Sequence, residues 1–321
     1  HATDTSNIGL GANAVDSITT GDYNVGIGDN ALTANTTASY NTALGWSSLE
    51  ANTEGHSNTA LGMNSLALNT TGNYNTASGY GALYSATTAS SNTAFGRRAL
   101  YNTTSSENVA VGASALDNNT SGAENVAVGE RTLEANTTAS NNTGVGRTAL
   151  FRNTTGADNT AIGHQALRNS TTSSNNTAVG KSALYANTTG HSNTSIGHAS
   201  MDANTTGSYN TAFGRDSLGL NTTASNNTAF GYNTLASTTT GTNNTAIGVD
   251  ALANNTGSDN TAVGLNSLIT NTSGIDNSAL GKASLEANTS GSQNVAIGRQ
   301  ALQANTTGNE NTAVGFEALK D

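Results

Sequence analysis

Apolar, small and polar residues recur along this chain with a fixed period, at every seventeenth position. Each repeat unit begins at an asparagine and reaches a glycine four positions later, as in the segment 210–214, whose sequence is NTAFG. The nineteen units begin at Asn7, Asn24, Asn41, Asn58, Asn75, Asn92, Asn108, Asn125, Asn142, Asn159, Asn176, Asn193, Asn210, Asn227, Asn244, Asn260, Asn277, Asn294 and Asn311, and two of the steps are shorter by one position. A short fixed period predicts a solenoid, because each unit is too small to fold alone and buries its apolar side only against its neighbours.

The apolar positions within one unit predict its strand. Counting the asparagine as position 1, position 4 is apolar in eighteen units, with Ser78 as the exception. Position 9 is leucine in seventeen units, and Val15 and Met201 occupy it in the other two. Alternation predicts that positions 2 and 4 of a short strand face the interior, and that position 9 begins or lies in a second strand facing the same interior. The predicted core holds one Leu, one Val, Ile or Phe, and one Thr or Val per coil.

The constant glycine and asparagine favour structural roles. Glycine at position 5 is predicted to adopt a positive φ, which other residues adopt at a higher cost. The asparagines at position 1 are predicted to form an amide ladder, each bonding to the next coil at the strand spacing of ~4.8 Å. Neither column is therefore predicted to bind a ligand.

Position 3 is Ala, Gly or Ser in every unit, and position 8 is Ala, Ser or Thr. If positions 2 and 4 face inward, position 3 faces solvent, where a restriction to small residues indicates close approach of another chain. The alternatives are a tight turn or a second interior layer within the same coil. The candidate intersubunit interface comprises Ala43, Ala60, Ala94, Ala110, Ala127, Ala161, Ala212, Ala246, Ala296 and Ala313.

Composition and charge narrow the function classes. Only 34% of the 321 residues are hydrophobic and 10% are charged, which by itself is typical of disorder, but the strict period argues against it. The expected fold class is all-β, a single continuous parallel β-solenoid over residues 1–321 without capping units. The net charge of −10, without a basic tract, disfavours nucleic acid as a partner, and no apolar run is long enough for membrane insertion.

Candidate chemistry is sparse. His164 and His198 share position 6 two coils apart, near 10 Å at the strand spacing, which is too far for one metal ion. No catalytic set, phosphate loop or paired carboxylates stand out, so we expect neither enzyme activity nor a cofactor or metal. Tyr23, Tyr40, Tyr74 and Tyr209 at the end of their units are interpreted as exposed turn residues, with contact to sugars as the alternative.

Repeated Asn-Thr-Thr and Asn-Thr-Ser segments are glycosylation acceptor patterns. The alternative is that these asparagines cap their turns by bonding to the local backbone. Repeated threonines also raise ice binding, but that function usually needs two hydroxyl columns on one face, and position 2 is predicted to point inward. The candidate glycosylation sites are Asn35, Asn69, Asn102, Asn136, Asn153, Asn187, Asn204, Asn221, Asn271, Asn288 and Asn305.

The phrase NVAIG at 294–298 resembles the YadA-like head repeats of trimeric autotransporter adhesins. The fuller repeat phrase is similar to repeats in the shafts of tail-fibre-like proteins. This resemblance implies a left-handed β-roll that trimerises about a common axis, with the alanine directed toward the trimer interface. The adhesin unit is shorter than the unit of this chain, and the additional residues here fall in the Asn-Thr-Thr-Gly segment.

The two ends of the sequence complement each other in phase. The last unit, 311–321, covers positions 1 to 11, and the six residues before Asn7 cover positions 12 to 17. This predicts a head-to-tail filament in which two chains complete one coil, unless the sequence is a window of a longer repeat. The start without Met is taken as the sign of a processed secreted protein or of an excised segment.

The expected function is that of a structural and adhesive fibre protein, extracellular or at a cell surface. It would assemble as a homo-oligomer through its small-residue face, head to tail, or both, with surface glycans as a further partner. The competing expectation is a ligand-binding β-solenoid, either ice-binding or a glycan-binding or glycosylated surface module.

Overall fold

The computed structural model describes residues 6–321, and within that range it consists of strands and turns without a helix. Residues 1–5, part of the segment invoked for coil completion, lie outside the described range. Nineteen parallel strands of three residues each confirm the predicted all-β parallel solenoid. They are β1 (Ile8–Leu10), β2 (Val25–Ile27), β3 (Thr42–Leu44), β4 (Thr59–Leu61), β5 (Thr76–Ser78), β6 (Thr93–Phe95), β7 (Val109–Val111), β8 (Val126–Val128), β9 (Thr143–Val145), β10 (Thr160–Ile162), β11 (Thr177–Val179), β12 (Thr194–Ile196), β13 (Thr211–Phe213), β14 (Thr228–Phe230), β15 (Thr245–Ile247), β16 (Thr261–Val263), β17 (Ser278–Leu280), β18 (Val295–Ile297) and β19 (Thr312–Val314).

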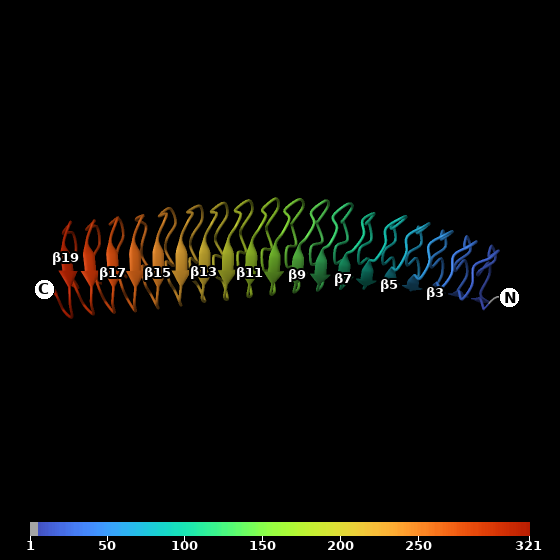
Figure 1. Cartoon of the computed structure of the whole chain (residues 1–321), viewed down its shortest axis with the longest axis horizontal. Helices are drawn as coiled ribbons and strands as arrows, with labels where there is room; N and C mark the ends of the chain where they lie inside the picture. The colour runs from blue at the N-terminus through green and yellow to red at the C-terminus, as the bar shows by residue number, and fades with distance from the viewer. Residues whose placement is uncertain (1–5) are drawn as a thin grey trace. The chain divides into compact units, whose positions relative to one another are not determined.

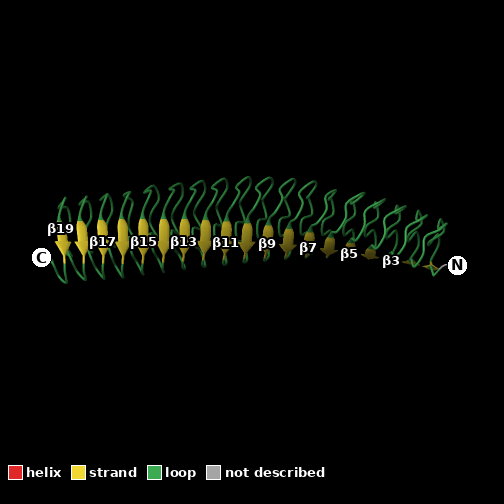
Figure 2. Cartoon of the chain, in the orientation of Figure 1, coloured by secondary structure: helices red, strands yellow, loops and turns green. Residues whose placement is uncertain are grey.

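The chain divides into two compact units, His1–Asn159 with β1 to β9 and Thr160–Asp321 with β10 to β19. Within each unit, the strands of successive coils lie side by side in sequence order (Figure 1). Their register follows the repeat, so that Ala43 pairs with Ala60 and Leu44 with Leu61. The strands occupy one side of each coil, and turns and loops form the rest (Figure 2).

Backbone hydrogen bonds join successive coils on the loop sides as well as along the strands. The Leu32 amide donates to the Ser48 carbonyl at 3.1 Å, and the Tyr40 amide donates to the Asp22 carbonyl at 3.0 Å. Proline lacks this donor, so its absence from the sequence suits a coil bonded on several sides.

The interior is lined by residues different from those predicted. The central residue of the strand, at position 3, points inward, and Ala43 and Ala60 are fully buried. Position 9 is also inside, as predicted, and leucines such as Leu49 have no exposed surface. Positions 2 and 4 point outward, so the prediction that they share the interior is wrong. Position 9 lies in a turn, and the predicted second strand is absent from the described residues.

The width of the coil explains this reversal. The turn that carries positions 7 to 9 packs against the inner side of the strand, where positions 3 and 8 leave room for one large side chain per coil, the leucine at position 9. A second large side chain, from position 4, would overfill this space, and overpacking a core typically costs about 1–3 kcal/mol. Small residues at positions 3 and 8 therefore indicate the interior.

The turn owes its shape to left-handed residues. In nearly every coil, positions 7 and 9 and the last residue have positive φ without being glycine, for example Asn30 at 60°, Leu32 at 54° and Tyr40 at 62°. Left-handed backbone costs a non-glycine residue roughly 1–2 kcal/mol. Full burial of a leucine side chain contributes about 1.5–3 kcal/mol, which offsets the cost at position 9.

The predicted roles of the constant glycine and asparagine are confirmed. The glycines at position 5 have φ between 127° and 142°. A β-carbon on Gly79 would also lie 2.7 Å from the carbonyl oxygen of Gly96 in the next coil, so both conformation and space exclude a side chain. In the asparagine ladder, Oδ1 of Asn41 accepts from the Asn58 amide at 3.0 Å, and Nδ2 of Asn58 donates to the Gly72 carbonyl at 2.8 Å.

Candidate interaction surface

The outer strand face consists of the side chains at positions 2 and 4 of the strands. Most position 2 residues are threonine and half-buried or exposed, and position 4 carries large apolar residues that reach solvent. Leu44 is 48% exposed and Phe230 is 51% exposed, although both belong to central parts of a sheet. The apolar column at position 4 includes Leu44, Leu61, Phe95, Val111, Val128, Ile162, Phe213, Phe230, Ile247, Leu280 and Ile297, all with more than a third of their surface exposed.

Strand register stacks like residues on one another along this face. Thr211 pairs with Thr228 and Phe213 with Phe230, so hydroxyl and apolar side chains form separate columns. The Phe213 and Phe230 rings are stacked, with centroids 4.8 Å apart and planes 9° apart. Beside the apolar column, position 6 adds further exposed apolar residues: Trp46, Met63 and Tyr80 in the first unit, and Tyr232, Val249 and Leu265 in the second.

The outer strand face is uncharged. Positions 2 and 4 hold no Asp, Glu, Lys or Arg in any of the nineteen units, although the chain has 32 such residues, 11 basic and 21 acidic. Single exposed apolar residues are ordinary on protein surfaces, but a contiguous apolar column is typical of an interaction site.

The ten alanines predicted to form an intersubunit interface do not lie on the surface. Nine of them, such as Ala110 and Ala212, are fully buried, and Ala313 is 3% exposed. They are small because the turn of their own coil packs against them, which is the interior-layer alternative. The small-residue face is therefore not an outer face, and the prediction is wrong for Ala43, Ala60, Ala94, Ala110, Ala127, Ala161, Ala212, Ala246, Ala296 and Ala313.

Most of the predicted glycosylation sites are also internal. Nδ2 of Asn136 donates to Oδ1 of Asn119 at 2.8 Å and to the Ala139 carbonyl at 3.0 Å. These asparagines form a second ladder at position 12, and an attached sugar would remove a donor and has no space beside it. The folded coil therefore contradicts glycosylation at the nine buried residues Asn35, Asn69, Asn136, Asn153, Asn187, Asn204, Asn221, Asn271 and Asn288.

Asn102 and Asn305 differ from the other nine. Asn102 lies in one of the two shortened units, and its place in the interior is taken by Thr103, which leaves the Asn102 side chain half-exposed. Asn305 is half-exposed in the last coil. Its Nδ2 still donates to Oδ1 of Asn288 and to the Gly308 carbonyl, each at 3.1 Å. Of the eleven predicted sites, Asn102 alone lies outside the ladder.

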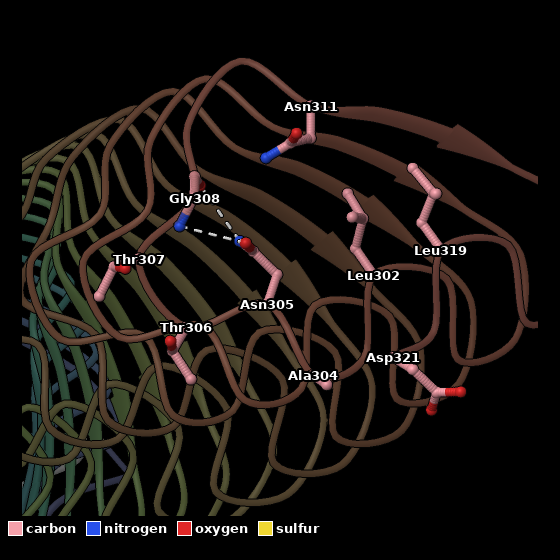
Figure 3. A pocket seen from close by; sticks show the side chains of 9 residues that line it. All are labelled: Leu302, Ala304, Asn305, Thr306, Thr307, Gly308, Asn311, Leu319 and Asp321. Carbon is pink, nitrogen blue, oxygen red and sulfur yellow. Dashed lines mark hydrogen bonds between the residues drawn. The ribbon is translucent and has the colours of Figure 1, made fainter.

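Figure 3 shows the interior at the last coils, where a depression of ≈ 410 Å³ exposes it. Leu302 and Leu319, one coil apart, lie on the same side of this space, and Asn305 bonds to Gly308 beside them (Figure 3). The depression is the coil interior itself, with an apolar leucine column next to an amide ladder. It does not form a separate site.

The titratable side chains of the described residues are not gathered around a common site. Among the residues that the structure describes, no three His, Cys, Asp or Glu side chains are grouped so that they could hold a metal ion. Over residues 6–321 there is also no helix that could span a membrane. Tyr23, Tyr40, Tyr74 and Tyr209 are exposed turn residues, as interpreted, and His56 and His191 each lie edge-on to the next tyrosine.

No protein-family model matches the chain, and no curated protein sequence matches it significantly. Among the described residues, the outer strand face is the strongest candidate interaction surface, and interpretation of the sequence missed it. The signal that could have found it was the restriction of positions 3 and 8 to small residues, which indicates a narrow interior and leaves position 4 outside.

Proposed function

We propose that this protein is a structural fibre protein of the extracellular space or cell surface, and that it associates with further copies of itself through the outer strand face. The observation that carries this proposal is the uncharged apolar column at position 4, which is present in both units. Transfer of exposed apolar surface out of water favours association by about 25 cal/mol for each Å² buried.

A second copy of the chain is the partner that fits this surface best. The columns repeat at the strand spacing of ~4.8 Å, and only a partner with the same spacing can match them coil by coil. Another copy provides that spacing and an equally uncharged face, and most soluble oligomers are built from copies of one chain with closed symmetry. The resemblance to YadA-like head repeats supports a trimer about a common axis, with positions 2 and 4 rather than the alanines at the interface.

Charged substitutions on the outer strand face test this proposal. Both Phe213 and Phe230 are exposed in the single chain, so the double variant Phe213→Lys, Phe230→Lys should fold. In analytical ultracentrifugation, the wild type should sediment as a multiple of 32.1 kDa, and the double variant should shift toward the monomer. Leu220→Lys is the matched control, because Leu220 is 57% exposed but lies outside the strand face.

A monomeric wild type at all accessible protein concentrations would overturn the proposal. Circular dichroism should be the same for all three proteins, which separates loss of assembly from loss of folding. If the double variant is as oligomeric as the control, the contact lies elsewhere on the coil.

Ice binding is the second candidate, and the outward threonine column favours it. Position 2 was predicted to point inward, but Thr211 and Thr228 are exposed. Seven consecutive strands of the second unit, β10 to β16, carry threonine at this position. The neighbouring column is apolar and includes bulky phenylalanines, so the outer strand face has a single hydroxyl column and assembly ranks first. Thermal hysteresis in the monomeric double variant would reverse that order.

A further inference from the structure

A groove of ≈ 420 Å³ lies among loop residues of the first unit, and no residue of positions 2 and 4 lines it. It spans the ends of three successive coils. Its volume falls in the range of about 300–1,000 Å³ that is typical of small-molecule sites. The side chains that could contact a ligand there are Ser39, Tyr40, Glu54, His56, Ser57 and Tyr74.

An interrupted tyrosine column creates this groove. Tyr23, Tyr40 and Tyr74 each occupy the last position of their coils, and Ser57 occupies it in the coil between the latter two. The Tyr23 and Tyr40 rings are stacked, with centroids 5.2 Å apart and planes 11° apart. The small Ser57 side chain leaves out one ring of this stack, and the exposed Tyr40 ring lines the resulting gap. Tyr74 lies two strand spacings from Tyr40, roughly 10 Å.

His56 and Glu54 provide polar groups beside this gap. The His56 ring lies edge-on to Tyr74, with centroids 5.2 Å apart and planes at 89°. The backbone amide of His56 donates to Oδ1 of Asn73 at 2.8 Å. Nδ1 of the His56 ring lies 3.4 Å from Oγ of Ser57. Glu54 is exposed and adds a carboxylate acceptor.

This combination of groups matches a sugar ring. A pyranose has an apolar face of C–H groups, which packs on an aromatic ring, and hydroxyls at its edge, which need hydrogen-bond partners. Tyr40 and Tyr74 are both 61% exposed and offer the aromatic surface. Glu54 is the only acidic residue of the groove, and no Lys or Arg lines it, so an anionic sugar would be repelled.

We propose that this groove is a saccharide-binding site that takes a neutral or amino pyranoside, stacked on Tyr40 and hydrogen-bonded by Glu54 and His56. The site lies within one chain and goes beyond the proposed assembly. A monomeric variant of the outer strand face should bind the sugar as the wild type does, so either proposal can fail alone.

The second unit contains a partial copy of the groove that serves as an internal control. His191 lies edge-on to Tyr209, with centroids 4.9 Å apart and planes at 88°, which repeats the arrangement of His56 and Tyr74. However, Asn175 stands where Tyr40 stands in the first unit, and Thr189 replaces Glu54. The partial copy therefore lacks both the stacking ring and the carboxylate.

The test is saturation-transfer NMR and calorimetry on the full chain with the methyl pyranosides of glucose, galactose, mannose and N-acetylglucosamine, with N-acetylneuraminic acid as the anionic probe. We expect one neutral or amino sugar to bind one site per chain. Tyr40→Ala and Glu54→Gln should each weaken binding at least tenfold, whereas Tyr209→Ala should leave it unchanged. The double variant Asn175→Tyr, Thr189→Glu should raise the stoichiometry from one site to two.

Three results would overturn the proposal: no binding of any probe at millimolar concentration, binding that survives Tyr40→Ala, or stronger binding of the anionic sugar. All the substituted side chains are exposed, and circular dichroism checks that each variant is folded. Unchanged stoichiometry in the double variant would show that the tyrosine gap does not define the site.

Discussion

Asparagines at position 12 illustrate how single residues stabilise the coil. Where the preceding coil also has asparagine at this position, Nδ2 donates to Oδ1 of that asparagine and to a carbonyl of its own turn, as Asn221 does to Asn204 and Ala224. The ladder breaks where another residue replaces asparagine. Thr238 follows Asn221 in this column, and Oδ1 of Asn221 is buried without a hydrogen-bond partner. An unpartnered buried acceptor of this kind typically costs about 1–3 kcal/mol.

Thr238→Asn should therefore stabilise the protein. The new amide would donate to Oδ1 of Asn221 and extend the ladder to Asn255. We expect the free energy of unfolding to rise by about 1 kcal/mol, measured by urea denaturation. Thr240→Asn, at an exposed position of the same turn, is the control and should change it by less than about 0.5 kcal/mol. A destabilised Thr238→Asn variant would mean that the coil is too narrow there for the amide.

Asp202 makes the stability of the second unit depend on pH. Burial raises the pKa of its carboxyl above the ordinary value of 3.8, and the neighbouring Asp216 charge raises it further. The folded chain thus retains a proton at pH values where the unfolded chain has lost it. Stability contributed by this group is present below pH 3.8 and is lost as the pH rises through the folded pKa.

Asp202→Asn removes this dependence. The variant should be more stable than the wild type at neutral pH, and the advantage should shrink as the pH falls toward 3.8. Urea denaturation at a series of pH values measures the difference between the two free energies of unfolding. An advantage that grows on acidification would show that the charged carboxylate stabilises the fold.

At the scale of the coil, the side chains at positions 3 and 9 are matched in volume. Val15 is the only β-branched residue at position 9 and takes the left-handed conformation, with φ of 53°. The first two strands carry glycine at position 3, where other coils mostly have alanine. A β-carbon on Gly26 would lie 2.9 Å from Cγ1 of Val15, and one on Gly9 would lie 2.3 Å from Cγ2. The two glycines therefore accommodate the branched side chain.

A double-mutant cycle tests this match. Gly26→Ala should destabilise the wild type, because the new methyl group overlaps Val15. In a Val15→Leu background the same change should be nearly neutral, since most other coils combine alanine at position 3 with leucine at position 9. We expect a coupling free energy of about 0.5–3 kcal/mol from urea denaturation of the four proteins. Additive effects would mean that the two positions do not share space.

The sequence predicted the position of the strand within the unit correctly, but it predicted the wrong side of the strand to face the interior. The strand at positions 2 to 4 and the glycine that follows it were predicted. A three-residue strand such as Thr42–Leu44 presents two residues on one side and one on the other, and local pattern does not say which side is inside. Because Leu44 is apolar, it was predicted to face the interior. The space inside the coil instead places the smaller Ala43 there.

At the scale of the whole molecule, charge and apolar surface are separated. The net charge of −10 comes from residues outside positions 2 and 4, so copies repel one another through residues that the proposed contact does not use. Salt screens such repulsion, with a Debye length that falls from about 30 Å at 0.01 M to about 3 Å at 1 M. Salt does not screen the contact between apolar side chains.

Self-association should therefore strengthen as ionic strength rises. In sedimentation experiments at a fixed protein concentration, the oligomer fraction of the wild type should increase from about 0.01 M to about 1 M NaCl. The Phe213→Lys, Phe230→Lys variant should remain largely monomeric throughout. Dissociation of the wild type at high salt would instead point to an interface held by ion pairs.

The sequence alone determined the solenoid, its period, the positive φ of its glycines, the position 1 amide ladder and the inward leucine. Each of these follows from a local requirement that repeats with every coil. Only the tertiary structure decided which strand face is exposed. It also decided that the position 3 alanines and most of the acceptor asparagines are buried, and that positions 2 and 4 form the outer strand face. The deciding quantity was the width of the interior, which depends on left-handed turns such as the one at Leu32 that local propensity does not favour.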